Sequence, residues 1–134
     1  MDRREKAALL STYKVLGAEV DRLAQEVCRW EDRRKALETV HFLEQSETKN
    51  EREIFRLQGE LRRKIREILY LRRKIDRAIS GLPDGTQRLL CSLRYLDGLT
   101  WEEIAEKMFY SVQHLHKIHV KALERIELDK DSIR

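Results

Sequence analysis

The sequence predicts an all-α protein, in which a long antiparallel helical hairpin (a coiled coil) precedes a cluster of short helices. Hydrophobic residues make up 41% of the 134 residues and charged residues 39%, with one proline and five glycines, so little interrupts helices. No segment is rich in Val, Ile and Thr and alternates apolar with polar residues, so the sequence has almost no signal for β-strands. Two long segments repeat apolar residues about every 3.5 positions, as paired helices do. We therefore expect a hairpin over residues 1–82 and a second domain over residues 83–134.

The first helix is expected over residues 2–38, with Asp2 as its N-cap. Its apolar residues recur at alternating steps of four and three, which predicts packing along a partner helix. The series is Leu9, Tyr13, Leu16, Val20, Leu23, Val27 and Trp30, and Leu37 continues it. Gly17 lies inside this helix and costs about 1 kcal/mol relative to alanine.

A chain reversal is expected between Thr39 and Asn50, where the apolar pattern lapses. Thr48 or Asn50 is expected to cap the second helix, over residues 51–80. A single continuous helix through this segment is the alternative, because no glycine or proline marks the boundary.

The second helix repeats the heptad spacing and ends at Gly81 and Pro83. Its seam is Ile54, Leu57, Leu61, Ile68, Leu71, Ile75, Ala78 and Leu82, with Lys64 in the missing slot. Ile65, Leu69 and Ile79 widen the apolar face beyond a two-stranded seam. The width predicts that a third helix packs here, from the C-terminal segment or from a second subunit.

Three shorter helices are expected after Pro83. Residues 87–96 place Leu89, Leu90, Leu93 and Leu96 on one face, and residues 97–99 form a tight turn. Thr100 and Glu103 have the spacing of a capping box, which starts a helix that turns Ile104, Ala105 and Met108 inward. After a turn at Phe109 and Tyr110, Ser111 caps a last helix over residues 112–128. The buried positions of this helix are Leu115, Ile118, Ala122, Leu123 and Ile126.

The last two helices have the pattern of a helix-turn-helix. Two capped helices lie within about twenty residues, and the small Ala105 allows them to approach closely. The second helix of such a unit enters the DNA major groove, where Gln pairs with adenine, Lys with guanine or phosphate, and Val with a thymine methyl. The outward positions are Val112, Gln113, His114, His116, Lys117, Val120 and Lys121.

The same stretch resembles region 4 of bacterial sigma factors. It is more similar still to small phage and prophage proteins related to ArpU-type late transcriptional regulators, whose N-terminal hairpin it also shares. The residues that carry the resemblance are Leu82-Pro83, Leu93-Arg94-Tyr95-Leu96-Asp97-Gly98-Leu99-Thr100-Trp101-Glu102-Glu103-Ile104-Ala105-Glu106-Lys107-Met108 and Ala122-Leu123.

The resemblance assigns roles to individual residues. It implies that Thr100 and Trp101 lie near the DNA backbone and that Lys121 faces a phosphate. It also implies that Val112, Gln113, His116 and Lys117 face bases; Ser111 and His114 complete the expected interface. The family usually has glycine where this chain has Phe109, so a positive φ there would cost about 1 kcal/mol or more. Histidines where sigma factors often have arginine predict a modest or pH-sensitive affinity.

The net charge of +4 is unevenly distributed. Residues 49–80 hold 11 Lys/Arg against 5 Asp/Glu, whereas residues 81–134 hold 8 against 9. The basic clusters at residues 62–66 and 72–77 can follow DNA phosphates or pair with acids of the first helix. Those acids are Glu19, Asp21, Glu26, Glu31 and Asp32.

Other classes of site find little support in the sequence. No nucleophile lies beside a base and no glycine-rich phosphate loop is present, so neither an enzyme nor a cofactor is expected. His116 and His119 lie three residues apart without a third ligand, so no metal site is expected, and the histidines of the last helix are expected to be solvated or to face DNA. Cys28 and Cys91 are expected to be reduced, partly buried thiols. No apolar run reaches the roughly 18 residues of a membrane span, which predicts a cytoplasmic protein near the nucleoid of a bacterial host.

Two functions remain open at this stage. The first is a transcription regulator that forms a homodimer or higher homo-oligomer, reads double-stranded DNA and has RNA polymerase as a further partner. The alternative is an interaction factor whose coiled coil binds RNA polymerase or a phage component, without sequence-specific DNA binding. The parts of a complete sigma factor that melt promoters are missing, so the chain is not expected to replace one.

Overall fold

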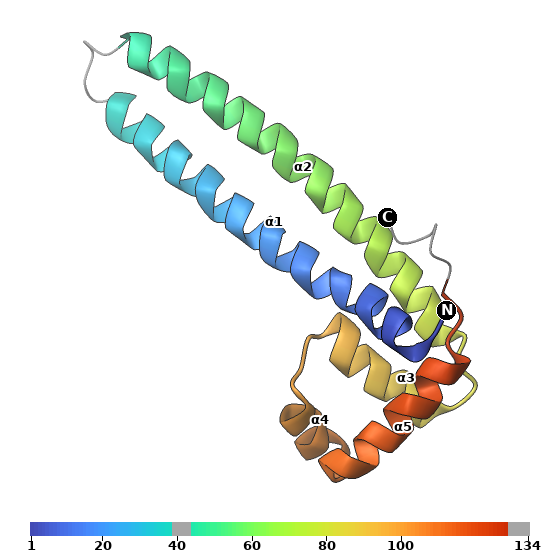
Figure 1. The fold of residues 1–134 in the computed structure, drawn as a ribbon. Helices are drawn as coiled ribbons and strands as arrows, with labels where there is room; N and C mark the ends of the chain where they lie inside the picture. Colours follow the sequence, from blue (N-terminus) through green and yellow to red (C-terminus); the bar gives the residue numbers. More distant parts are fainter. Residues whose placement is uncertain (39–43, 129–134) are drawn as a thin grey trace. The chain divides into compact units, whose positions relative to one another are not determined.

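The computed structural model describes residues 1–38 and 44–128, with side chains described at residues 1–36 and 50–128. Its helices are α1 (Arg3–Glu38), α2 (Glu44–Ser80), α3 (Gly85–Cys91), the π-helical turn η1 (Ser92–Leu96), α4 (Trp101–Met108) and α5 (Val112–Arg125) (Figure 1). No strand occurs within the described residues. The all-α prediction, with two long helices followed by a short-helix domain, is confirmed.

The chain divides into two compact units, which we call the middle unit and the terminal unit. The middle unit is residues 16–68, and the terminal unit is residues 1–15 together with residues 69–134. Both long helices therefore contribute to both units. The expected boundary after residue 82 stays a prediction.

In the middle unit, α1 and α2 run antiparallel. Glu19 of α1 pairs with Lys64 of α2 at 3.0 Å, and Glu31 further along α1 accepts a hydrogen bond from Gln58 at 3.0 Å. Leu23, Val27 and Leu57 form the buried core, with Trp30 and Leu61 packed against it. These are seam positions of the heptad pattern, so the pattern identified this core correctly.

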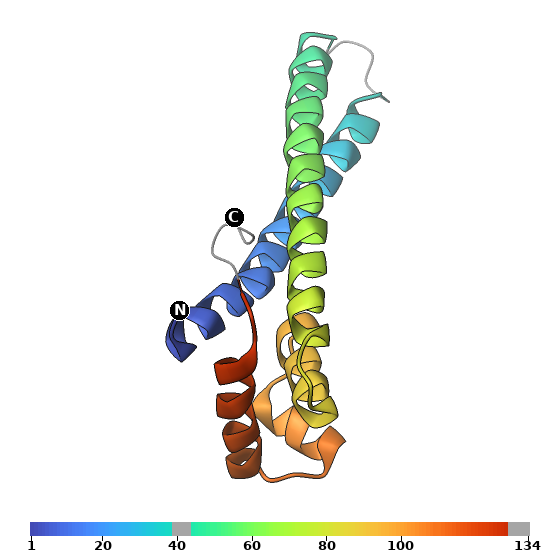
Figure 2. The same cartoon turned by 90° about the vertical axis from the view of Figure 1, so that its right-hand side faces the viewer.

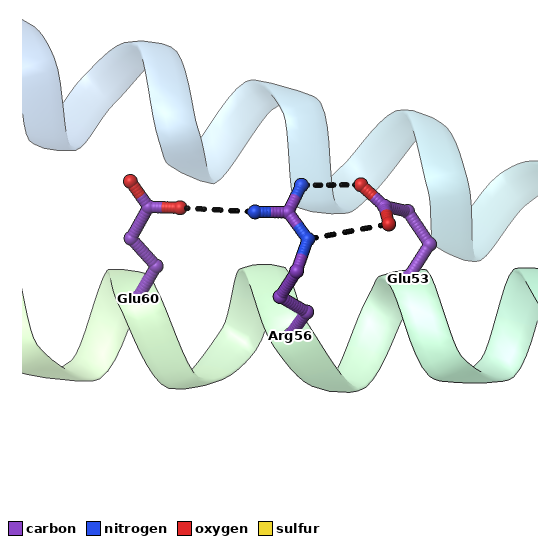
Figure 3. Close-up of polar contacts among 3 residues, drawn as sticks. All are labelled: Glu53, Arg56 and Glu60. Atoms are coloured by element: carbon purple, nitrogen blue, oxygen red, sulfur yellow. Dashed lines mark hydrogen bonds and ion pairs between the residues drawn. The ribbon is translucent and has the colours of Figure 1, made fainter.

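Glu53, Arg56 and Glu60 form a charged network along one side of α2 (Figure 3). Arg56 donates to both oxygens of Glu53, and its Nη1 lies 3.6 Å from a Glu60 oxygen. The hydrogen bond from Arg56 lowers the pKa of Glu53, and the hydrogen bond to Glu53 raises the pKa of Arg56. This arginine is therefore engaged within its own helix.

Two predictions about the long helices need correction. The second helix begins at Glu44, so Thr48 and Asn50 lie within it; no glycine or proline stops the helix from extending over residues 45–50. The apolar face is also narrower than expected, since Ile79 is buried but Ile65 and Leu69 are exposed. Residues 39–43 of the predicted reversal lie outside the described residues.

In the terminal unit, α5 packs against α3 and α4 (Figures 1 and 2). The core between them is Leu90, Leu93, Ile104 and Leu115. The first residues of α1 belong to the same unit: Leu10 is fully buried, and Lys6 Nζ donates to the Glu124 carbonyl at 3.4 Å. Leu10 was missed in the sequence because it lies one position off the heptad series.

The predicted helix over residues 87–96 is two pieces. Asp84 accepts from the amides of Thr86 and Gln87 and starts α3 at Gly85, and the chain then widens into η1. Leu89 was expected to share one face with Leu90 and Leu93, but it is half exposed whereas they are buried. Leu90 and Cys91 take the buried positions. Leu89 lies about 100° around the helix from Leu90 and about 200° from Cys91, so it faces away from the core.

Candidate nucleic-acid interface

The α4 N-terminus is fixed by Thr100 and Glu103. The Thr100 hydroxyl accepts from the Glu103 amide at 3.2 Å, and the Glu103 carboxylate accepts from the Thr100 amide at 3.4 Å. The predicted capping box is confirmed. It satisfies two amides that the first turn would otherwise leave unpaired, and it fixes where the helix starts.

The turn after α4 places Phe109 in the left-handed backbone region. Phe109 has φ 59° and ψ 37°, and the next amide, that of Tyr110, donates to the Ala105 carbonyl at 3.2 Å. This bond spans six residues, as in the glycine-terminated end common to helices. Phe109 therefore adopts the positive φ for which the sequence predicted strain, and it is 92% exposed. No buried contact therefore offsets the strain.

Helix α5 starts at Val112 because Ser111 caps it. The Ser111 hydroxyl accepts from the His114 amide at 3.1 Å, which confirms the predicted cap. Leu115, Ala122 and Leu123 are buried, and Ile118 packs against the core. The helix ends at Arg125 rather than at residue 128, because Ile126 leaves the helical backbone at ψ 133° and is buried there.

The opposite side of α5 is polar and open. Exposed side chains occur at Gln113, His114, His116, Lys117 and Lys121, while Val112 and Val120 are half-buried. Neither lysine forms an ion pair with any described residue. Thr100 and Ser111 are exposed at the two helix starts. All nine expected interface residues thus lie on α4, on α5 or at their N-caps, and Trp101, like Val112, is half-buried.

Trp101 lies in a cluster of rings between η1, α4 and α5. Its ring centroid is 4.6 Å from that of His116 and 4.8 Å from that of His119, both in edge-to-face geometry. The Arg94 guanidinium lies 4.8 Å from the Trp101 centroid, and Arg94 also donates to the Leu99 carbonyl at 3.0 Å. These contacts make Trp101 a packing residue between η1, α4 and α5.

His119 is neither solvated nor DNA-facing, contrary to the expectation for the histidines of this helix. Its Nε2 is hydrogen bonded to the Tyr95 hydroxyl at 2.5 Å. Burial, together with the charges of Arg94 and His116, lowers the pKa of His119 to about 4. Burial also raises the pKa of Tyr95. His119 sits on the inward side of α5, one turn past Leu115, so it is a neutral packing residue near pH 7.

The basic residues of α2 have few acidic partners. Lys64 pairs with Glu19, as one interpretation predicted, and Arg72 donates to the Tyr13 hydroxyl at 3.0 Å. Five other arginines are exposed and form no ion pair within the described part of the chain: Arg62, Arg63, Arg66, Arg73 and Arg77. Within the two basic clusters of residues 62–66 and 72–77, an acidic partner is therefore seen for Lys64. That the other basic side chains of these clusters contact DNA phosphates stays a prediction.

The described residues include no three His, Cys, Asp or Glu side chains arranged to hold a metal ion. Both cysteines are free; Cys91 is buried, which raises its pKa to about 12, whereas Cys28 is exposed rather than partly buried. None of the described helices combines the length and apolar character needed to cross a membrane.

The capped helices α4 and α5, joined by the turn at Phe109, define a helix-turn-helix. Residues 78–127 match the family model of sigma-70, region 4, and form a sigma-70 region 4 helix-turn-helix domain. No curated protein and no solved structure matches the chain. The domain's fold points to DNA binding in transcription.

Proposed function

We propose that the chain is a DNA-binding transcription regulator, encoded by a phage or prophage, that reads the major groove with the exposed face of α5. The observation that carries this proposal is the polar, unpaired side of α5 in a sigma-70 region 4 domain. Gln113, His116 and Lys117 would contact base edges, and Lys121 a phosphate. We further propose that the chain is not an enzyme and works beside the nucleoid in the host cytoplasm.

The charge distribution supports the terminal unit as the DNA-binding part. Residues 1–15 and 69–134 together hold 16 Lys/Arg and 12 Asp/Glu, whereas residues 16–68 hold 12 of each. The whole net charge of +4 therefore belongs to the unit that contains α5. The positive charge therefore lies in the same compact unit as the helix-turn-helix, although residues 81–134 alone carry no positive excess. A positively charged unit favours approach to a polyanion such as DNA.

The long helices are proposed to join two copies of the chain or to bind RNA polymerase. In the middle unit, Ile65 and Phe55 expose apolar surface on α2, Phe55 by 72% of its side chain. A homodimer with two-fold symmetry would present two copies of α5 to an inverted repeat.

A second candidate is an interaction factor without sequence-specific DNA binding. It is favoured by the fully exposed Phe109 beside the half-exposed Tyr110, which together offer a protein partner apolar surface at the turn. In that case the long helices and this turn bind RNA polymerase or a phage component.

The test is binding of the purified chain to DNA from its own genomic neighbourhood, with unrelated DNA as competitor, at two salt concentrations. We expect protection of one discrete site and an affinity that falls steeply with salt. The double variant Gln113→Ala/Lys117→Ala should lose roughly tenfold or more in specific affinity. The matched control Gln25→Ala/Lys107→Ala changes the same exposed residue types elsewhere and should not. Equal, weak binding to all DNA would contradict the proposal and favour the interaction factor.

A further inference from the structure

Trp101 is held from two sides by groups that are themselves fixed. Arg94 lies over its ring and is tied to the Leu99 carbonyl. His119 lies against it and is tied to the Tyr95 hydroxyl. The indole is therefore a rigid platform at the start of α4, half-buried where η1, α4 and α5 meet.

His116 is the exposed side chain that rests on this platform. Its ring stands nearly perpendicular to the indole, at 78° and 4.6 Å between centroids. Its neighbours on the same side of α5, Gln113 and Lys117, form no side-chain hydrogen bond or ion pair with a described residue, so they keep their rotamer freedom. His114 also meets an aromatic ring, that of Tyr110 at 4.8 Å, but Tyr110 is itself 40% exposed beside the strained Phe109.

We propose that Trp101 is a positioning residue that holds the His116 imidazole in one orientation on the DNA-facing side of α5, and thereby sets which base pair His116 selects. This inference rests on the proposed DNA-binding function and names a determinant of its specificity. Trp101 acts through His116 in this scheme and needs no contact of its own with DNA.

An imidazole distinguishes base edges only when its orientation is fixed. Each ring nitrogen offers one donor or one acceptor in a fixed plane, so discrimination between base edges depends on where that plane points. A histidine free to change rotamer can meet several base edges and selects weakly among them. A ring held by edge-to-face packing selects more sharply, because fewer orientations remain to be lost on binding. Phosphate contacts carry no such information and would be unaffected.

The test compares Trp101→Leu, Trp101→Phe, His116→Ala and the double variant Trp101→Leu/His116→Ala in the full chain. Affinity is measured for the protected site, for single base-pair substitutions across it and for unrelated DNA. We expect Trp101→Leu to lose about fivefold or more of the discrimination at one base pair, the same one that His116→Ala affects. The double variant should lose no more than His116→Ala alone, and Trp101→Phe should keep most of the discrimination. Affinity for unrelated DNA should stay within about twofold throughout.

A second readout needs no DNA. The ring protons of His116 should be displaced from free-histidine chemical shifts by the indole ring current, and Trp101→Leu should return them while those of His114 stay in place. Thermal unfolding of each variant verifies the fold, and Trp101→Met replaces Trp101→Leu if the leucine variant does not fold.

The outcomes separate the inference from the function on which it rests. Additive losses in the double variant, or losses by Trp101→Leu and His116→Ala at different base pairs, would overturn the positioning role while leaving DNA recognition intact. Unchanged His116 shifts in Trp101→Leu would also overturn it. Wild-type protein that protects no discrete site would contradict the proposed function, and the inference with it.

Discussion

Phe109 holds a left-handed backbone conformation that costs a non-glycine residue about 1–2 kcal/mol. The side chain is 92% exposed, so replacing it removes almost no packing. Phe109→Gly relieves the strain but gives the unfolded chain more freedom, which offsets part of the gain. We expect the free energy of unfolding to rise by about 0.5–1 kcal/mol in urea titrations.

The matched control is Phe109→Ala, which removes the ring but keeps the strained backbone. It should change the free energy of unfolding by no more than about 0.5 kcal/mol. An equal gain in both variants would show that the exposed ring, rather than the backbone conformation, is the source of the effect.

His119 makes stability depend on pH in a defined window. Its pKa of about 4 in the folded chain lies below its ordinary value of 6.5, because burial disfavours the charged ring. The unfolded chain therefore binds more protons between these values, and stability falls as the pH drops from 6.5 toward 4. The full lowering of the His119 pKa would correspond to a larger loss of unfolding free energy. Because His119 is partly exposed, we expect a loss of about 1–2 kcal/mol.

Urea unfolding at pH 7 and pH 4.5 of the wild type and His119→Gln isolates this contribution. Glutamine keeps a hydrogen-bonding group for the Tyr95 hydroxyl, which His119 contacts in the wild type, but glutamine does not titrate. We expect the wild type to lose about 1–2 kcal/mol more than the variant between the two pH values. Equal losses would mean that other groups account for the acid sensitivity.

At the scale of the elements, α1 and α2 each contain one interior glycine that the packing does not require. A Cβ at Gly17 would meet Ile68 Cδ1 at 3.6 Å, an ordinary contact, and a Cβ at Gly59 would meet nothing within 4 Å. Gly17→Ala and Gly59→Ala should each raise the free energy of unfolding by about 1 kcal/mol. Gly98→Ala should lower it instead, because Gly98 has φ +70°. Thermal or urea unfolding of the three variants checks the signs, and a loss in Gly17→Ala would show that α1 and α2 approach more closely there.

Local signals predicted the elements better than long-range ones. Capping at Thr100 and Ser111 depends on residues within one turn, and it is found as expected. The position where strain could arise, Phe109 in place of the glycine usual in the family, was likewise visible in a short motif. No glycine or proline marks the start of α2, so Thr48 and Asn50 were misjudged as caps. Leu10 is buried because another part of the chain covers it, which no heptad can reveal.

The candidate interface shows the same limit. Its exposed members on α5 follow from helical periodicity once Ser111 fixes the register. The sequence did not predict that His119 turns toward Tyr95 or that Trp101 contacts His116, because those residues are up to 24 positions apart and meet only after folding. A polar residue on the inward side of an amphipathic helix was the available signal for His119.

At the scale of the whole molecule, the terminal unit joins the two ends of the chain. Residues 1–15 pack with the sigma-70 region 4 domain, although the family match begins only at residue 78. Lys6 contacts the Glu124 carbonyl, and Tyr13 accepts a hydrogen bond from Arg72. The unit that contains the helix-turn-helix therefore includes the first turns of α1, which lie far from it in the sequence.

Leu10→Ala tests this dependence in the full chain. Leu10 is fully buried, and its truncation should cost about 2–5 kcal/mol of unfolding free energy. In a Trp30→Phe background, fluorescence reports Trp101 alone, so the urea midpoint seen by Trp101 should fall with Leu10→Ala. Val15 is 61% exposed on the same helix. Val15→Ala should leave the midpoint nearly unchanged and the free energy of unfolding within about 0.5 kcal/mol of the parent. If Leu10→Ala and Val15→Ala gave the same Trp101 midpoint, the first turns of α1 would contribute nothing to the domain, and residues 69–134 would suffice to hold α5 in place.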